Sequence, residues 1–156
     1  MKAYVILFFS IIAMSMGCKK YDNNGNKPAT EKKVVVTTVA GNGEPTFVND
    51  PVLSATFDSP EDIAIAADGT IYVTDALNFC TRKIGGGKVL TFAGGSGFGI
   101  RNGNETTTQF KNPYSIALDA NGNLYNTDEN DPRIRKISPD GNVSTYAGIE
   151  TPGLAD

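Results

Sequence analysis

The side chains that most often carry acid–base or metal chemistry are scarce in this sequence. It contains no histidine, which excludes the most usual general base, the most usual zinc ligand and the Ser/His and Cys/His pairs of nucleophilic catalysis. Of the two cysteines, Cys18 and Cys80, the second has no evident activating partner. A lone thiol of this kind is more often a small buried hydrophobic group than a nucleophile. We therefore predict no catalytic residue and no cofactor.

Two acidic stretches and one glycine-rich stretch have the composition of ligand-binding loops without the required spacing. "DANGN" from Asp119 begins like a calcium-binding EF-hand loop but lacks its sixth-position glycine, and "DENDP" from Asp128 places Pro132 at a ligand position. "AGGSGFGIRNG" (93–103) contains neither GxGxxG in register nor GK[ST], and no helical pattern follows it. We predict no metal site and no phosphate loop here. The acidic residues are expected to close turns, and the glycines to connect structural units.

Binding residues are better sought in two long connections. Loops above about 12 residues are often functional, and the connections 41–59 and 94–112 exceed that length. Their candidate contact residues for a protein or glycan ligand are Phe47, Phe98, Arg101 and Asn102. The alternative is that these aromatic side chains only pack the loops. Nucleic acid is not an expected partner, because the net charge is −3 and no Lys/Arg-rich run lies outside residues 19–33.

The N-terminus has the pattern of a secretory signal. Lys2 precedes the apolar run "AYVILFFSIIAM" and the small-residue stretch "SMGC", the order typical of a cleaved signal peptide. The apolar run is shorter than the roughly 20 residues that span a bilayer. "SMGC" resembles the lipobox of bacterial lipoproteins, in which the chain is cut before the cysteine, here Cys18, and the cysteine carries the lipid. Gly17 suits this motif, whereas Ser15 departs from the usual leucine-like residue.

This resemblance implies a signal peptide over 1–17 and a lipid on Cys18 that anchors the chain to a membrane of the bacterial cell envelope, facing the periplasm or the cell surface. Several acyl chains would make the anchor stable. The alternative is an ordinary signal peptide in which Cys18 is incidental. Residues 18–33 are polar and mixed in charge, which predicts a flexible tether. The globular part is expected over 34–156.

An internal repeat dominates the globular part. "SPEDIAIAADGTIYVTD" begins at Ser59 and "NPYSIALDANGNLYNTD" at Asn112, 53 residues further on. The same step relates "RKI" at 82–84 to "RKI" at 135–137, and "TVAG" at 38–41 to "TFAG" at 91–94. A third copy, "TYAG", lies at 145–148. Such self-similarity is the pattern of repeat architectures.

Each repeat predicts four short antiparallel strands. The apolar runs "DIAIAA" and "SIALDA" are followed by Asp-Gly or Asn-Gly turns, then by β-branched and aromatic segments. A four-stranded meander of this length is typical of a propeller blade. We expect repeat 1 over about 57–94, repeat 2 over about 110–148 and the start of a third connection over 149–156. The predicted inner-strand core is Ile63, Ile65, Ile116 and Leu118, with Tyr72 and Tyr125 packed between blades.

These motifs in combination resemble NHL repeats, over residues 36–156. The family implies a six-bladed β-propeller, so the predicted fold is all-β: a partial propeller of two four-stranded antiparallel blades plus an orphan N-terminal strand, "VVVTTVAG" (34–41). Asn126 departs from the family by replacing an apolar residue and needs a polar partner if buried. "NFCTRKI" also departs, because the family prefers His and Arg there.

Six units would need about 320 residues. Two explanations remain for the shorter chain: truncation, or self-association of several copies through exposed blade edges. The expected function is a lipid-anchored, extracytoplasmic, non-catalytic binding scaffold. The alternative is a fragment of a propeller enzyme, similar to lactonases or lyases, whose metal and catalytic residues lie in missing blades.

Overall fold

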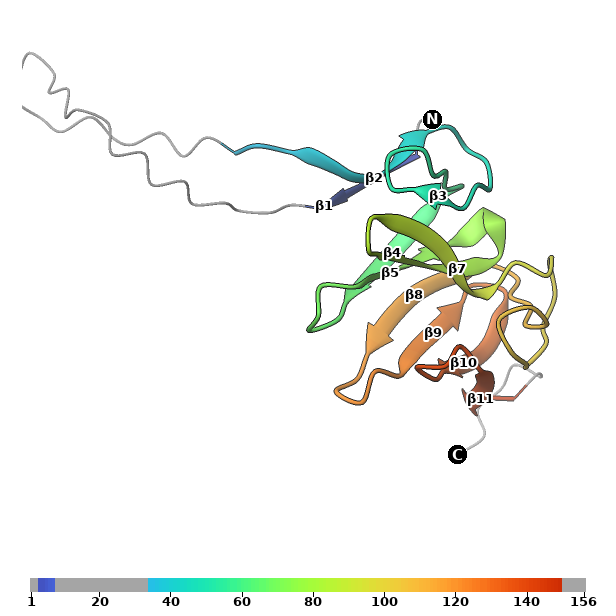
Figure 1. Cartoon of the computed structure of the whole chain (residues 1–156). Coiled ribbons are helices and arrows are strands. Elements are labelled where there is room, and N and C mark those ends of the chain that lie inside the picture. The colour runs from blue at the N-terminus through green and yellow to red at the C-terminus, as the bar shows by residue number, and fades with distance from the viewer. Residues whose placement is uncertain (1–2, 8–33, 150–156) are drawn as a thin grey trace, which may run out of the picture.

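The computed structural model describes residues 3–7 and 34–149 (Figure 1). Two antiparallel sheets make up the body of the described residues. The first blade consists of β4 (Pro60–Ile65), β5 (Ile71–Asp75), β6 (Cys80–Gly85) and β7 (Lys88–Gly94). The second blade consists of β8 (Pro113–Leu118), β9 (Leu124–Asp128), β10 (Asp131–Ile137) and β11 (Val143–Ala147). The predicted all-β fold with two four-stranded propeller blades is confirmed.

The 53-residue repeat holds in strand register as well as in sequence. Ile63 pairs with Val73 in the first blade, and Ile116 pairs with Asn126 at the equivalent position of the second. The turn between the first two strands of each blade contains a glycine with positive φ, +85° at Gly69 and +82° at Gly122. Glycine is favoured there because a Cβ disfavours this backbone region.

Two short elements were not expected from the repeat. β3 (Asp50–Pro51) comes from the connection 41–59 and pairs with β7, so the first sheet has five strands. η1 (Ala76–Asn78) is a single 3₁₀ turn between β5 and β6. Among the described residues it is the only helical element.

The N-terminal strand is shifted from its predicted position. It was expected at 34–41, whereas β2 spans Thr37–Gly43 and leaves Val34, Val35 and Val36 exposed outside the strand. β2 pairs with β1 (Ala3–Leu7), which lies inside the predicted signal peptide. The rest of that segment and the predicted tether through Lys33 lie outside the described residues.

The register of β1 matches that of the third strand of a blade. Val5 pairs with Ala40 and Ile6 with Thr38, and a register shift falls between the two pairs. Ala93 and Thr91 of β7 are the repeat equivalents of Ala40 and Thr38. They pair with Thr81 and Arg82 of β6, and a register shift falls between these two pairs as well. β2 is therefore built as an outermost blade strand, and β1 lies where a third strand would lie.

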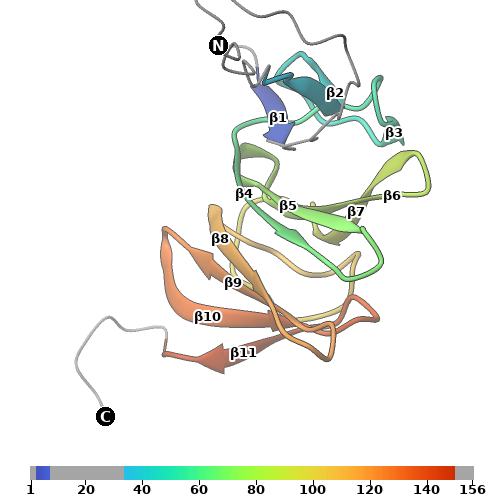
Figure 2. The same cartoon turned by 90° about the vertical axis from the view of Figure 1, so that its left-hand side faces the viewer.

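Each blade has its own apolar core, and the two cores are equivalent by the repeat. The first contains Ala40, Ala55, Phe57, Ile71, Val73, Ile84 and Val89. The second contains Ala93, Phe110, Ile116, Leu124, Ile137 and Val143. The blades lie face to face as two layers (Figure 2), so one face of the first blade covers the second core.

Three of the four predicted inner-strand core residues pack as expected. Ile116 is buried, and Ile63 and Leu118 are partly buried against the two cores. Ile65 is a correction, because its side chain is 47% exposed. Its repeat equivalent, Leu118, lies in β8, which runs beside β4 of the first blade. On the corresponding side of β4 the described residues place β1 and β2 and no other blade (Figure 2).

The two tyrosines predicted to pack between blades have different environments. Tyr72 packs against the second core, with its ring centroid 5.0 Å from that of Phe92, as predicted. Tyr125 forms the equivalent pair with Tyr146 at 4.9 Å, but Tyr146 is 62% exposed. Within the described residues, Tyr125 is therefore not between two blades. It lies on the face of the second blade that is equivalent to the covered face of the first.

Candidate functional site

The connection 41–59 folds over a buried arginine in the third strand of the first blade. Arg82 is fully buried, and its Nη1 donates to the Asp75 carboxylate at 2.7 Å and to the carbonyl of Thr56 at 2.9 Å. Its Nη2 donates to the Val48 carbonyl and to Oδ1 of Asn49, at 2.9 and 2.8 Å. A planar fork with several donors suits such a set of acceptors. The arginine thus fixes the course of the loop.

Two aromatic rings enclose the same guanidinium. Its carbon lies 4.9 Å from the ring centroid of Phe47 and 5.0 Å from that of Phe57. Both distances are within the range of a cation–π interaction. Phe57 is fully buried, whereas Phe47 is 46% exposed. Phe47 is therefore an anchored ring that still presents part of its surface to solvent.

The second repeat rebuilds this arrangement with equivalent residues. Arg135 is buried, and its Nη2 donates to Oδ1 of Asn102 at 2.6 Å and to the carbonyl of Arg101 at 2.8 Å. Its guanidinium carbon lies 5.4 Å from the ring centroid of Phe110. Asn102 and Phe110 each lie 53 residues after Asn49 and Phe57. The two long connections therefore share one structural role, which is to wrap the arginine of their repeat.

The ion pairs of the two arginines differ. Asp75 bonds Arg82 directly, and burial raises the pKa of the Asp75 carboxyl, opposed by hydrogen bonds from Asn78, from the main chain of Asp58 and from Arg82. In the second repeat Asp131 stands at the position of Asn78, and its carboxylate lies 3.6 Å from Arg135. Burial lowers the pKa of Arg135, and the nearby Arg133 adds to this shift.

The four predicted binding residues do not form one site. Oδ1 of Asn102 accepts a hydrogen bond from the Arg135 guanidinium, and the main-chain carbonyl of Arg101 accepts another from the same group. Phe98 is exposed and meets Phe79 edge-on, with centroids 5.7 Å apart. Phe47 lines a pocket of the described residues, and the other three do not line that pocket. The side chain of Asn102 and the main chain of Arg101 therefore contribute to the fold of their own connection.

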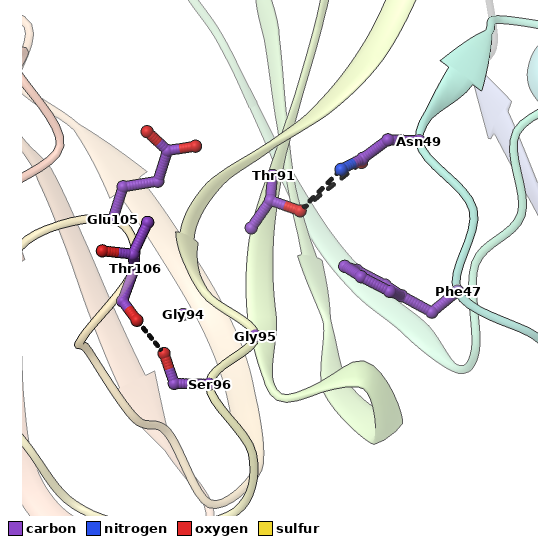
Figure 3. A pocket seen from close by; sticks show the side chains of 8 residues that line it. All are labelled: Phe47, Asn49, Thr91, Gly94, Gly95, Ser96, Glu105 and Thr106. Carbon is purple, nitrogen blue, oxygen red and sulfur yellow. Dashed lines mark hydrogen bonds between the residues drawn. The ribbon is translucent and has the colours of Figure 1, made fainter.

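The pocket lies between the two connections, beside the outermost strand of the first blade, and has a volume of about 390 Å³ (Figure 3). Phe47, Asn49 and Thr91 form one side, where Nδ2 of Asn49 donates to the Thr91 hydroxyl at 3.1 Å. Residues of the other connection form the facing side and the base; they are Gly94, Gly95, Ser96, Glu105 and Thr106.

Contacts within the second connection fix the facing side of the pocket. The Ser96 hydroxyl donates to the carbonyl of Thr106, and Asn104 caps the same turn by accepting from the main chain of Thr106 and Thr107. Glu105 stands at this turn with an exposed side chain (Figure 3). The pocket therefore combines an anchored aromatic ring with hydroxyl, amide and carboxylate groups.

Gly94 at the base of the pocket cannot carry a side chain. Its φ is +88°, and a Cβ there would lie 2.6 Å from the carbonyl oxygen of Phe79 and 2.7 Å from the ring of Phe110. Gly148, the last residue of the third "AG" copy, has φ +83° and meets the carbonyl of Pro132 in the same way. The repeated glycine is required because the end of the outermost strand packs tightly on the start of its neighbour.

The repeated acidic residues close turns, as predicted. Asp75 accepts a hydrogen bond from the main chain of Asp58 at 2.7 Å, and Asp128 accepts from Lys111 and Asn112 at its equivalent position. Asp119 accepts from the main chain and side chain of Asn123, which, with further hydrogen bonds, holds its pKa below the ordinary value. Across residues 3–7 and 34–149, no cluster of three or more His, Cys, Asp or Glu side chains could hold a metal ion.

Cys80 is a buried free thiol, as predicted, and burial raises its pKa. Cys18, the predicted lipidation site, lies outside the described residues. In the part of the chain that the structure describes, no helix is both long and apolar enough to cross a membrane. The role of Asn49, Arg82 and Arg135 in organising the loops was not predicted from the sequence. The available signal was the 53-residue step from Arg82 to Arg135, which recurs from Asn49 to Asn102.

Comparison with known proteins supports the fold. No protein-family profile matches the chain. A curated relative, Protein SUPPRESSOR OF QUENCHING 1, chloroplastic, from Arabidopsis thaliana, is 34% identical over 98 residues, which is 61% of this chain and 9% of that protein. The chain therefore spans about a tenth of this relative.

Solved structures from Bacteroides thetaiotaomicron are also similar. An auxiliary nutrient binding protein is 23% identical with a TM-score of 0.59, over 81% of this chain and 31% of that one. A structure described as a putative phosphatase is 21% identical with the same TM-score, over 83% and 30%. The chain thus shares a propeller-like fold with proteins of which it spans less than a third.

Proposed function

We propose that this chain is an NHL-type, non-catalytic binding module, held outside the cytoplasm by a lipid on Cys18, whose ligand site is the pocket between its two long connections. The observation that carries the proposal is the Phe47 ring. Arg82 and Asn49 hold the segment that bears it, and Phe47, which lines the pocket, remains 46% exposed. An aromatic ring held in place loses little conformational entropy when it binds a ligand.

The ligand class that this pocket fits is a hydroxylated ring, such as the pyranose of a glycan. The apolar C–H face of a sugar packs on an aromatic ring, and its hydroxyls need hydrogen-bonding groups around that ring. Thr91 and Glu105 supply hydroxyl and carboxylate groups there, while Asn49, whose Oδ1 accepts from Arg82, holds the Thr91 hydroxyl in place. The pocket has a volume of about 390 Å³ and is open to solvent, so a ligand there would keep one side exposed, as a sugar at the end of a glycan chain can. A protein partner would need a larger contact area.

The proposed location supports this choice of ligand. A module tethered through Cys18 and residues 18–33 would face the nutrients outside the cell or in the periplasm. One solved structure of similar fold is named an auxiliary nutrient binding protein, and a small nutrient ligand for this chain is in keeping with that name.

The test is a glycan array probed with the full chain, followed by titration calorimetry of the strongest glycan against matched variants. Phe47→Ala and Glu105→Gln should each weaken binding at least tenfold. Phe98→Ala, which removes an exposed phenylalanine that does not line the pocket, should leave the affinity within twofold. Circular dichroism would show that each variant is folded.

Two results would contradict the proposal. If no glycan on the array binds, the ligand class is wrong. If Phe98→Ala weakens binding as much as Phe47→Ala does, the pocket is not the site.

A further inference from the structure

The pocket between the two connections is lined by one charged side chain, that of Glu105. This side chain is exposed, and no Lys or Arg of the described residues forms an ion pair with it. The hydrogen bonds that hold its turn run from the main chain of Thr106 and Thr107 to Asn104, and none within the described residues reaches the Glu105 carboxylate. The fold therefore leaves this negative charge available to a ligand.

The guanidinium of Arg82, which lies against the Phe47 ring, does not cancel this charge. Arg82 is fully buried and bonded to the Asp75 carboxylate at 2.7 Å, so the pair has no net charge. Its carbon lies 4.9 Å from the Phe47 ring centroid, so the attraction that the ring offers to a cation is already used by Arg82. Phe47 therefore suits the apolar face of a sugar, and a cationic group of the ligand is expected at Glu105.

One polar pair beside the pocket recurs in the second repeat. Nδ2 of Asn49 donates to the Thr91 hydroxyl at 3.1 Å, and Nδ2 of Asn102 donates to the Thr145 hydroxyl at 3.3 Å. Each asparagine also accepts from the buried arginine of its repeat. The recurrence indicates that this pair belongs to the fold of the blade, whatever ligand the pocket takes.

Two pocket residues depart from the repeat. Ile100 stands 53 residues after Phe47, and Val52 stands 53 residues before Glu105. Val52 packs on the first core, so the blade needs no carboxylate at this position of a connection. Phe47 and Glu105 lie on opposite sides of the pocket (Figure 3). The aromatic ring and the carboxylate are therefore what distinguishes this pocket from the repeated framework.

We infer that the pocket selects a pyranose that carries a free, protonated amine, with its apolar face on Phe47 and its ammonium group on Glu105. This inference rests on the proposed function and narrows the class of glycan. An ammonium group offers the carboxylate an opposite charge and three N–H donors. A hydroxyl at the same ring position offers a neutral donor, an N-acetylated amine has no charge, and the carboxylate of a uronic acid is repelled.

The size of the preference is limited by solvent. Because the pocket is open and Glu105 is exposed, salt and water screen the contact between the two charges. We expect the free-amine form of a glycan to bind about tenfold more tightly than its hydroxyl or N-acetyl form at low salt, as for one charge-assisted hydrogen bond. The preference should shrink as the salt concentration rises.

The test uses the full chain and an array of gluco-, galacto- and manno-configured oligosaccharides, each present in free-amine, N-acetyl and hydroxyl forms, with uronic acids beside them. Titration calorimetry then compares the forms of the strongest binder. Glu105→Gln should remove the preference for the amine, and Glu105→Lys should shift it to the uronic acids. Glu44→Gln is the matched control, because Glu44 is an exposed carboxylate of the first connection that does not line the pocket, and it should keep the preference.

The outcomes separate this inference from the proposed function. If the three forms bind equally, or the neutral or acidic forms bind best, and Phe47→Ala still weakens binding, the charge selection is wrong and the glycan site stands. If Glu44→Gln reduces the preference as much as Glu105→Gln does, the amine is attracted by the overall charge of the chain, and the inference is wrong. If no glycan binds, or Phe47→Ala has no effect, the proposed function fails and the inference with it.

Discussion

The guanidinium of Arg82 lies 2.7 Å from the carboxylate of Asp75, and neither side chain is exposed to solvent. The pair joins the third strand of the first blade to the end of its second strand. The same arginine also binds the connection 41–59 through Val48, Asn49 and Thr56. One side chain therefore couples the fold of the blade to the shape of the candidate pocket.

Removing Arg82 should be strongly destabilising. Arg82→Met leaves the Asp75 carboxylate buried without its partner, and breaking a buried pair in this way typically costs about 3–5 kcal/mol. We expect a loss of that size in the free energy of unfolding, measured by urea denaturation. Lys88→Met removes an exposed cation of β7 and should change the same quantity by less than about 0.5 kcal/mol. Similar losses for both variants would refute the structural role of Arg82.

The strands and their grouping into blades could be predicted because the information is local and repeated. Alternation, turn glycines and the 53-residue step locate β4 to β11 within one or two residues at most ends. The exposure of Ile65 could not be read in this way, since its sequence context equals that of Leu118. What differs is the neighbouring element in space: Leu118 lies beside the inner strand β4, whereas among the described residues β4 has only β1 and β2 on the corresponding side.

The candidate site was harder to predict for a similar reason. Arg82 and its acceptors Val48 and Asn49 are separated by 34 and 33 residues, so no local pattern links them. Asn102 was assigned to ligand binding from its place in a long loop, and the structure shows that its Oδ1 accepts hydrogen bonds from the buried Arg135. The repetition of Asn49 and Arg82 as Asn102 and Arg135, 53 residues further on, could have revealed that these asparagines bind the arginines.

Gly94→Ala should destabilise the protein far more than Gly97→Ala. Both glycines have positive φ, +88° and +96°, but an added Cβ at Gly94 would clash with the Phe79 carbonyl, whereas none of the surrounding atoms lies within 4 Å of one at Gly97. We expect a loss of more than about 2 kcal/mol for Gly94→Ala and about 1 kcal/mol for Gly97→Ala, where only backbone strain applies. Thermal and urea unfolding would measure both. Equal effects would show that the contact with Phe79 is relaxed.

Asn126 between the blades should be replaceable together with its partner. Its Nδ2 donates to the Thr81 hydroxyl, but its Oδ1 is buried and has no hydrogen-bond partner among the described residues. A valine stands at the equivalent position of the first repeat, Val73, and an isoleucine at the position equivalent to Thr81. We expect the double variant Asn126→Val, Thr81→Val to be about 1–3 kcal/mol more stable than Asn126→Val alone, because the single change leaves the hydroxyl unpaired.

The measurement for this pair is a double-mutant cycle by urea unfolding, with Thr81→Val as the fourth protein. If the double variant is less stable than Asn126→Val, an apolar contact does not fit between these strands. The polar pair would then be required for blade packing.

Cys18→Ala should abolish metabolic labelling by a fatty-acid analogue in a bacterial host. The proposed lipid is carried by Cys18, so the alanine variant has no group to which it can be attached. Cys80→Ala is the matched control, since Cys80 is buried, and it should label like the wild-type chain. Labelling that persists in Cys18→Ala would leave the ordinary signal peptide as the remaining explanation.

The contact between the inner strands should weaken in acid. Oδ2 of Asp62 on β4 accepts from the Ser115 hydroxyl at 2.7 Å and from the main chain of Ile116 at 2.9 Å, both on β8. Partial burial alone would raise the pKa of Asp62. These two bonds and one from the main chain of Ile63 outweigh it and hold the pKa below the ordinary value.

The sign of the pH effect follows from this depressed pKa. A carboxyl with a lower pKa in the folded than in the unfolded protein adds stability above the unfolded pKa, about 3.9, and loses it as the pH falls through the folded pKa. The wild-type chain should therefore exceed Asp62→Asn in free energy of unfolding at pH 6, and the difference should shrink toward zero near pH 2. Urea unfolding across this range measures both proteins. Because their other carboxyls are the same, a difference that stays constant with pH would show that Asp62 does not hold the blades together through its charge.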